Sequence, residues 1–424
     1  MFGSWSFDYY YSLPFWAALV AVACVVRAFG RSAGLRGAVL LAASTALLLA
    51  IPGFRAVHLG LVWMISAISF ASARALTRSS GPTPRRRAIA AAGVVAVIAL
   101  LAFFKYHFLQ DVVLGPVAPA RDAATPRGAA AYLFLIGVSY FSFKAIHVVV
   151  ETYRGAIGAV GALTFFNYMT FFPAFISGPI NRYGEFAAQM DTSRAGALWP
   201  DLRAGGERIV HGLFKKLVLV PIVFPYVLTN LGKPLARASL GEAALGLYAY
   251  AIYFFFDFSS YTDLAIGGAR VIGVQLPENF NKPFFQKNIR DLWTNWHMTL
   301  TSWLVDYVYW PVVRKLRNLE YFRTRPVLLS IVGMNVTFIG CGIWHGEAPH
   351  FVLWGAYHGL GISVLNLYQR QKKRIRSPAL QRWFKSPYSH WVGAFATFNF
   401  FALGLALFVL DLEKVGTLLA AVFR

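Results

Sequence analysis

The sequence predicts an all-α, polytopic membrane protein of about 10–11 transmembrane helices. The first observation is composition: 57% of the 424 residues are hydrophobic and only 14% are charged. A soluble globular chain has about 45–50% apolar and about 25% charged residues. The second observation is that apolar runs recur whose length approaches the roughly 20 residues that cross a bilayer. Together they exclude an ordinary soluble enzyme and a disordered chain.

The charge of the chain is strongly positive, at +22 from 40 Lys and Arg against 18 Asp and Glu. In a soluble protein such an excess would suggest nucleic acid. Here the cations lie between the apolar runs, where they set topology and contact lipid headgroups. We therefore expect anionic lipids, and no nucleic acid, as partners. Cys24 and Cys341 lie far apart in apolar segments and predict neither a disulfide framework nor a metal site.

Ten segments are apolar and long enough to be candidate spans. Basic residues cluster after the first, third and ninth of them, and basic loops stay in the cytoplasm. This predicts a multi-pass protein with its N-terminus outside. The ten candidate spans are 14–29, 37–54, 57–76, 88–109, 131–150, 208–230, 241–262, 327–343, 349–368 and 391–410.

The apolar stretch 162–180 does not fit a simple crossing, because the spans before and after it both place its ends in the cytoplasm. It contains Phe-Phe-Pro at 171–173 and Ser-Gly-Pro at 177–179, which break a helix. Broken backbone at membrane depth is tolerated only inside protein or beside a water-filled cavity. We therefore expect a re-entrant hairpin at 162–180.

The same topology leaves the long segment 263–326 on the cytoplasmic side. This segment is too polar to span and too rich in Trp and Tyr to be a plain linker. Over 286–316 its apolar residues recur at helical spacing. Two interpretations stay open: an interfacial helix lying on the membrane, or helices that enter the bundle and floor a cavity.

Two Trp-His pairs are the strongest candidates for chemistry. Trp296-His297 lies in the amphipathic segment, and Trp344-His345 ends an apolar span. An ionisable side chain near the hydrocarbon is costly and marks a functional site by default. Glycines at 342 and 346 let a backbone or a ligand approach His345. Desolvation should keep its imidazole neutral, which suits a general base.

Other polar side chains also stand at or near membrane depth. Asp257, in an aromatic run, is costly unless paired, and a histidine, Arg182 and Arg290 all stay open as its partner. The sequence has no phosphate-binding loop, no HExxH and no GxSxG motif. No carboxylate spacing suggests a metal site. A transporter, which would bind its cargo without covalent change, stays open as an alternative.

Five motifs occur in an order that resembles the membrane-bound O-acyltransferase family. Any one of them would be weak, but five in order over roughly residues 100–410 are specific. Within the family the chain is most similar to the bacterial cell-envelope branch, first to the teichoic-acid D-alanyltransferase type and next to the alginate O-acetyltransferase type. The motifs are GVSYFSFKAIHVVVETYRG at 137–155, FFPAFISGPINRYGEF at 171–186, FFFDFSSYTDLAIG at 254–267, PENFNKPFFQKNIRDLWTNWHMTLTSWLVDYVYWPV at 277–312 and GIWHGEAPHFVLWGAYHG at 342–359.

The resemblance implies an enzyme of the bacterial cytoplasmic (inner) membrane, with helices around a central funnel. It implies no bound cofactor. The donor is an acyl thioester, carried on the phosphopantetheine arm of an acidic carrier protein or on coenzyme A, and the acceptor is a hydroxyl on the other side. A small membrane or periplasmic relay protein is a further expected partner. One integral-membrane domain (1–424) would comprise peripheral helices (1–100), a catalytic core (131–368) and a basic loop with a closing helix (369–424).

The resemblance also implies roles for individual residues. His345 matches the catalytic histidine of the family and His297 its second histidine, nearer the donor. Donors to a developing oxyanion could be His297, Asn279, Asn281 or a backbone N–H near 177–179. The residues expected to bind substrate are Asn279, Asn281, Trp296, Trp344, Asp257 and Ser177. Those expected to dock the carrier are Lys282, Lys287, Arg290, Arg314 and Lys315.

The expected reaction is therefore transfer of an acyl group, with D-alanyl first, onto an extracytoplasmic envelope acceptor such as teichoic acid. O-acetylation of an exported polysaccharide or of peptidoglycan is the alternative within the same chemistry.

Overall fold

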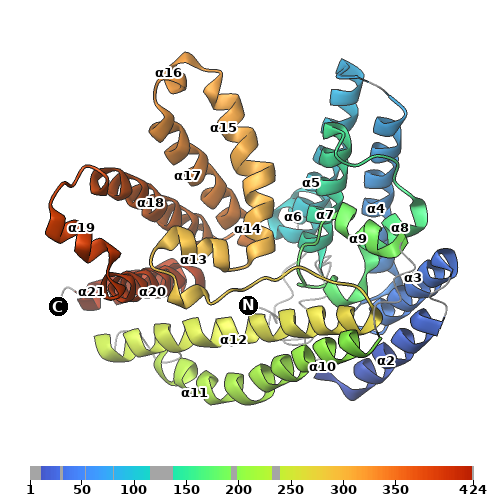
Figure 1. The fold of residues 1–424 in the computed structure, drawn as a ribbon, viewed down its shortest axis with the longest axis horizontal. Coiled ribbons are helices and arrows are strands. Elements are labelled where there is room, and N and C mark those ends of the chain that lie inside the picture. Colours follow the sequence, from blue (N-terminus) through green and yellow to red (C-terminus); the bar gives the residue numbers. More distant parts are fainter. Residues whose placement is uncertain are drawn as a thin grey trace. The chain divides into compact units, whose positions relative to one another are not determined.

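The computed structural model of the chain is built almost entirely of helices (Figure 1). It describes residues 11–28, 32–52, 54–79, 81–114, 137–191, 198–231 and 239–422. Within these ranges no strand forms, and the only β-type pairing is an isolated antiparallel bridge between Phe280 and Trp296. The predicted all-α class is confirmed.

Each predicted span overlaps a helix, although the fourth, 88–109, is interrupted at Tyr106, and residues 29 and 53 of the first and second spans lie outside the described ranges. The fifth was expected from residue 131, and its first residues, 131–136, lie outside the described ranges. The sixth is a continuous run in which α10 passes through a π-helical turn, η3, into α11. In chain order the helices are α2 (Leu13–Ala28), α3 (Ala33–Leu49), α4 (Ala56–Thr77), α5 (Pro84–Lys105), α7 (Val138–Arg154), α10 (Leu198–Phe214) with η3 (Lys215–Leu219) and α11 (Val220–Leu231), α12 (Leu240–Ile272), α17 (Pro326–His345), α18 (Pro349–Lys372) and α20 (Pro387–Val409).

Five stretches are long and apolar enough to cross a membrane by themselves, judged by length and composition: Ala56–Thr77, Pro84–Lys105, Leu198–Val227, Pro326–His345 and Pro387–Val409. Pro14–Ala28 and Ala33–Leu49 are shorter apolar helices. The remaining long helices α7, α12 and α18 contain buried polar residues such as Lys144, Asp263 and His358. This set of helices is that of a polytopic membrane protein.

The chain divides into two compact units. The first comprises Met1–Leu213 with Ser260–Pro277, and the second comprises Phe214–Ser259 with Glu278–Arg424. Helix α12 contributes residues to both. The expected division into peripheral helices, core and closing helix stays a prediction.

The first unit contains the stretch predicted as a re-entrant hairpin. Helix α8 (Ala162–Thr170) ends at the Phe-Phe-Pro sequence, a short 3-10 turn, η2 (Phe172–Ala174), follows, and the chain then runs without regular structure to α9 (Tyr183–Asp191). The helix break is where the proline and glycine predicted it. The short helix α6 (His107–Leu114) also belongs to this unit.

Side chains of α7 stabilise that irregular stretch. Lys144 is buried and its Nζ donates to the carbonyl oxygen of Tyr168 at 2.9 Å. The hydroxyl of Tyr168 donates to the carbonyl oxygen of Asn181 at 2.8 Å. The backbone N–H of Tyr183 donates to Nε2 of His147 at 3.0 Å. Because buried backbone groups need partners, these bonds allow non-helical chain to persist in an apolar setting.

The second unit contains the amphipathic stretch 286–316, which is several short helices rather than one. They are η5 (Pro283–Phe285), α13 (Ile289–Asn295), α14 (Met298–Leu304), the π-helical turn η6 (Val305–Tyr309), α15 (Trp310–Arg317) and α16 (Glu320–Arg323). Leu292, Trp296 and Leu300 are all buried. The stretch therefore packs into the unit, which favours the second of the two interpretations left open by the sequence.

Four of the later helices of the second unit begin with proline. Proline occupies a first-turn position of α17, α18, α19 (Pro378–Lys385) and α20, where its missing N–H has no helical partner to lose. Helices α17 and α18 lie side by side (Figure 1). The chain continues into α21 (Leu412–Val422).

Candidate active site

His345 is the last residue of α17. Gly342, one turn earlier, faces the backbone of α18: a Cβ on it would overlap the carbonyl oxygen of Phe351. On α18, a Cβ on Gly355 would overlap the carbonyl oxygen of Phe338. The absence of side chains at these glycines lets the two helices approach closely. The expectation that Gly342 admits another backbone beside His345 is confirmed.

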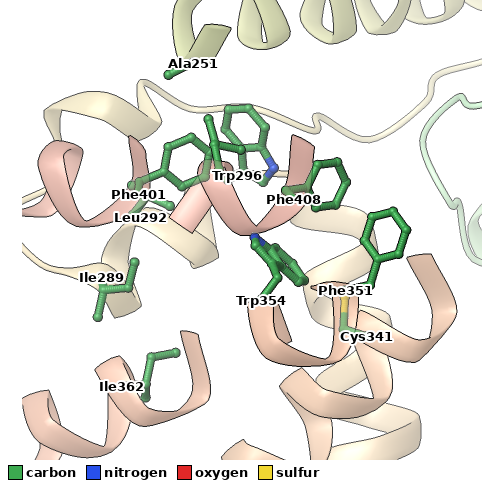
Figure 2. Packing of buried hydrophobic residues seen from close by; sticks show 11 residues of the cluster. Ala251, Ile289, Leu292, Trp296, Cys341, Phe351, Trp354, Ile362, Phe401 and Phe408 are labelled. Atoms are coloured by element: carbon green, nitrogen blue, oxygen red, sulfur yellow. The ribbon is translucent and has the colours of Figure 1, made fainter. Parts of the chain in front are cut away.

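Aromatic rings surround the half-buried His345. The ring of Trp354 lies edge-on at 5.1 Å between centroids, and that of Phe408 lies edge-on at 4.9 Å. Phe351 is stacked at 6.3 Å, and Trp344 lies at 4.6 Å. Figure 2 shows Phe351, Trp354 and Phe408 packed together. The imidazole is therefore in contact with aromatic rings on several sides.

The other Trp-His pair, Trp296-His297, lies where two segments of the chain are joined by backbone hydrogen bonds. We call these two segments, residues 279–281 and 295–299, the clasp. Phe280 bridges Trp296, the N–H of Asn281 donates to the carbonyl oxygen of Asn295 at 3.0 Å, and the N–H of Met298 donates to that of Asn279 at 2.9 Å. These long-range bonds place the asparagines directly against the histidine segment.

The backbone at the clasp adopts an uncommon conformation. His297 has φ of 44° and Lys282 has φ of 47°. Among the described residues these are the two non-glycine positions with positive φ. Left-handed backbone is unfavourable for residues with a Cβ, and it persists where the surroundings fix it, commonly at functional sites.

The imidazole of His297 is buried and neutral. It caps α14, with Nδ1 accepting the N–H of Leu300 at 3.3 Å, and its ring lies 4.8 Å from that of Phe258. Burial lowers the pKa of His297 to about 3. Since Nδ1 accepts, the proton of the neutral ring is on Nε2. His297 can therefore donate a hydrogen bond at neutral pH but is not positively charged.

Asn279 presents a donor of fixed direction. Its side chain is fully buried, and its Oδ1 accepts two bonds from Thr299, from the hydroxyl at 2.6 Å and from the backbone N–H at 3.4 Å. A backbone N–H can only donate, so the side-chain orientation is settled. Nδ2 is buried and has no hydrogen-bond partner among the described residues. An unsatisfied buried donor costs about 1–3 kcal/mol, a cost that an acceptor bound at Nδ2 would remove.

One buried cluster contains Trp296 of one motif together with Phe351, Trp354 and Phe408 (Figure 2), and Trp344 of the other motif packs against this cluster. Trp296 of the clasp packs against Phe401, with centroids 5.0 Å apart, and belongs to the same cluster as Trp354, Phe351 and Phe408 around His345. The sequence singled out the two motifs separately, and the fold of the second unit brings them together.

The other expected substrate residues are distributed differently. The carboxylate of Asp257 forms an ion pair with Lys216 at 2.7 Å, a partner that sequence reasoning had not considered. Asn281 is exposed and contributes through its backbone. Ser177 belongs to the first unit, where its hydroxyl donates to Tyr140 at 3.0 Å and its N–H donates to the hydroxyl of Tyr261 at 3.3 Å.

The expected carrier-docking residues fall into two groups. Lys282, Lys287, Arg314 and Lys315 are exposed. Arg290 is half-buried and bonds to the side-chain oxygens of Asn366 and Gln369 on α18. Because those partners are neutral amides, they fix the side chain of Arg290 without compensating its positive charge.

Two features of the site were missed by sequence reasoning. One is Thr299, which orients Asn279 and lies two residues after His297. Its role could not be predicted, because it depends on the bridge between Phe280 and Trp296, which brings Asn279 next to it. His358 is fully buried among the rings of Trp293 and Trp354, at 4.9 Å from each, with no hydrogen-bond partner at either ring nitrogen among the described residues. Its position one turn after Trp354 was the available signal.

Comparison with known proteins identifies the family of the chain. The model of the membrane-bound O-acyltransferase family matches residues 127–410, which include both Trp-His motifs. The teichoic acid D-alanyltransferase of Bacillus subtilis (strain 168) is 32% identical over 275 residues, covering 64% of this chain and 68% of that protein. The corresponding enzyme of Streptococcus thermophilus is 29% identical over 318 residues, covering 72% and 75%.

Alginate enzymes form a second group of relatives. The probable alginate O-acetylase AlgI of Azotobacter vinelandii is 30% identical over 273 residues, covering 64% of this chain and 52% of that protein. The chain thus matches only about half the length of this relative. Because the family model covers well over half of the chain, this protein belongs to the membrane-bound O-acyltransferase family and is a multi-pass membrane acyltransferase.

Proposed function

We propose that this enzyme moves a D-alanyl group from a carrier-protein thioester across the cytoplasmic membrane onto a hydroxyl of a cell-envelope acceptor. The observation that carries the proposal is that His345 packs against Trp354 and Phe408, which belong to the same buried cluster as Trp296 of the clasp. The teichoic acid D-alanyltransferases among the relatives support D-alanine as the acyl group. The acyl group and acceptor would enter from opposite sides of the bilayer.

His345 acts as the general base in this proposal. The acceptor hydroxyl attacks the thioester carbonyl while His345 takes its proton, a form of catalysis that contributes typically about 10²–10⁴-fold. The new C–O bond forms, and the carbonyl becomes a tetrahedral oxyanion. When the C–S bond breaks, the imidazolium of His345 returns the proton to the leaving thiolate. The products are the ester and the free thiol.

The clasp stabilises the oxyanion in this proposal. Nδ2 of Asn279 is a preorganised donor in a dry environment, where hydrogen bonds to developing charge are strongest. His297 supplies a second donor through Nε2, because burial keeps its ring neutral. Trp296 and Trp344 then form apolar walls of the site. Asp257 takes a positioning role through Lys216.

Exposed cations dock the acidic carrier protein in this proposal. Lys282, Lys287, Arg314 and Lys315 supply positive charge on the second unit, and Arg290 supports them. Complementary charge speeds association and makes it sensitive to salt. Charge reversal at Arg314 and Lys315 should weaken binding of the purified carrier and flatten its salt dependence. Reversal at Arg85 and Arg87, exposed on α5, is the matched control. Equal loss in both variants would contradict the docking site.

The basic loops support an orientation with the N-terminus outside, and localisation to the inner membrane is part of the same proposal. A reporter that is active only in the cytoplasm, inserted near Gln371, should be active if this topology holds. Activity of a periplasm-specific reporter at the same place would reverse the orientation.

O-acetylation of an exported polysaccharide is the second candidate, because the alginate O-acetylases are also relatives. Ester analysis of the envelope separates the two. Cells lacking the gene would be complemented with wild type, with His345→Ala, or with the control His211→Ala, an exposed histidine of α10. Mild base releases the esters, and mass spectrometry identifies the acid.

Three outcomes are distinguishable. D-alanine released with wild type and His211→Ala, but not with His345→Ala, supports the proposal. Acetate in the same pattern keeps the mechanism and changes the acyl group. Esters that persist with His345→Ala contradict the role of His345.

A further inference from the structure

The end of α18 and the connection that follows it, residues 370–385, concentrate positive charge without any compensating acid. It contains seven cations, Arg370, Lys372, Lys373, Arg374, Arg376, Arg382 and Lys385, and the chain has no Asp or Glu anywhere from 348 to 410. None of the seven forms an ion pair with a described residue. Such a concentration of charge is costly by self-repulsion unless anions are close.

The second half of this connection is an amphipathic helix. In α19, Leu380, Trp383 and Phe384 follow the i, i+3, i+4 spacing of one helical face, and Arg382 and Lys385 lie on the opposite face. Leu380 is 45% exposed and Trp383 is 44% exposed. Lys372 lies over the ring of Phe384, 4.0 Å from its centroid. The apolar face is thus only partly covered by the protein's own residues.

The residues that follow continue the apolar surface. Tyr388 is 73% exposed and Trp391 is 59% exposed, both in the first turns of α20. Trp and Tyr favour the boundary between headgroups and acyl chains. A short amphipathic helix beside them, between two long helices, has the features of a helix that lies in the plane of the interface.

We propose that residues 370–391 form an in-plane anchor that binds anionic phospholipid headgroups with its cations and inserts Leu380 and Trp383 into the acyl-chain boundary. Charge and apolar surface together select this ligand. An acidic protein would satisfy the cations but leave the apolar face exposed, and a neutral lipid would cover the apolar face but leave the cations uncompensated. The inference does not depend on the acyl transfer proposed above.

The depth of α19 tests the first half of the proposal. Single cysteines at Leu380 and at Lys385 would be spin-labelled in the full chain carrying Cys24→Ser, since Cys341 is buried. The protein would be placed in vesicles of equal phosphatidylglycerol and phosphatidylcholine. The label at 380 should be more accessible to oxygen than to a water-soluble nickel complex, and the label at 385 should show the reverse. Equal accessibility of both labels to the nickel complex would overturn the proposal.

The lipid preference tests the second half. Native mass spectrometry of the protein released from the same lipid mixture would count bound phosphatidylglycerol. Arg382→Gln with Lys385→Gln should lower the retention of phosphatidylglycerol about tenfold or more. Each Lys or Arg near an anionic surface adds to the binding free energy, and the loss of two such contributions corresponds to at least this change in affinity. Arg314→Gln with Lys315→Gln removes equal charge from α15 and should leave retention unchanged.

Competing occupants give different results in the same design. If inorganic phosphate displaces phosphatidylglycerol, the site recognises a free anion and the lipid assignment is wrong. If Arg382→Gln with Lys385→Gln weakens binding of the purified carrier protein while lipid retention is unchanged, the segment is a protein-docking surface instead. Loss of lipid with unchanged carrier binding supports the anchor and leaves the proposed acyl transfer untouched.

Discussion

Two fully buried asparagines, Asn167 in the first unit and Asn279 in the second, are satisfied in opposite ways. Asn167 donates both hydrogens of Nδ2, to the carbonyl oxygens of Gly37 and Leu163 at 2.9 Å each, and its Oδ1 has no partner among the described residues. Asn279 accepts two bonds at Oδ1 and leaves Nδ2 without one. The first leaves a lone pair and the second leaves a proton, so only the second can stabilise a developing negative charge.

The same contrast holds for the histidines around them. His147 accepts a backbone N–H from Tyr183 and sits in regular helix. His297 also accepts a backbone N–H, but from a left-handed position in the clasp. Similar polar groups therefore satisfy backbone N–H groups in the first unit and, in the function proposed above, take part in the chemistry of the second. The following experiments test that difference, in order of decreasing expected effect.

The largest effect is expected for His345→Ala. Loss of the general base should lower the transfer rate per folded molecule by about 10²–10⁴-fold. His147→Ala, in the first unit, should instead lower the melting temperature and leave the rate of the folded fraction near wild type, because it removes a bond to backbone. Rates in proteoliposomes, normalised to folded protein, measure both. Similar rate losses in the two variants would break the comparison.

The second effect is expected for Asn279→Asp, which keeps the acceptor for Thr299 and replaces the Nδ2 donor by oxygen. Removing an oxyanion donor costs about 10²–10³-fold in kcat. Asn167→Asp loses two donors to backbone and should reduce stability rather than kcat. Steady-state kinetics with one carrier thioester measure kcat for both variants, and thermal melts measure their stability. An Asn279→Asp enzyme with unchanged kcat would remove Asn279 from the mechanism.

A third, smaller effect separates two glycines of α17. Gly342→Ala inserts a methyl group against the carbonyl oxygen of Phe351 and should cost about 1–3 kcal/mol by overpacking. A Cβ on Gly340 meets nothing within 4 Å, so Gly340→Ala should be neutral or stabilising by up to about 1 kcal/mol. Thermal melts in detergent compare them. Equal destabilisation would show that helix packing does not position His345.

The smallest effect is a pH dependence of stability from His297. Its folded pKa, lowered by burial, is about 3, whereas the unfolded value is 6.5. Between these two pH values the unfolded chain binds a proton that the folded chain does not bind. The contribution of His297 to the free energy of unfolding is therefore fully present above pH 6.5 and is lost as the pH is lowered toward 3. His297→Gln should flatten this part of the profile, and the exposed His211→Gln should not. A steeper profile in His297→Gln would contradict the assignment of a neutral ring.

Much of the fold could be predicted from the sequence because it depends on local properties. Apolar runs gave the helices, and Phe-Phe-Pro gave the break after α8. The site could be predicted only in part. His345 and His297 were identifiable by the cost of a polar group in apolar sequence. The partner of Asp257 was not, since Lys216 lies 41 positions away on a different helix. The left-handed backbone of His297 arises from the bridge between Phe280 and Trp296, which no local pattern specifies.

The fixed side chain of Asn279 has a consequence for the range of substrates. Two bonds from Thr299 to Oδ1 prevent the amide from turning, so Asn279 can donate a hydrogen bond from Nδ2 to a substrate oxygen but cannot turn its own oxygen to accept one. In the proposed transfer that oxygen is the thioester carbonyl, on which the negative charge develops. Every acyl thioester has the same carbonyl, whether it carries alanine or acetate. If Asn279 binds only this shared carbonyl, the choice of acyl chain depends on residues outside the clasp. Those residues can change without altering the reacting centre.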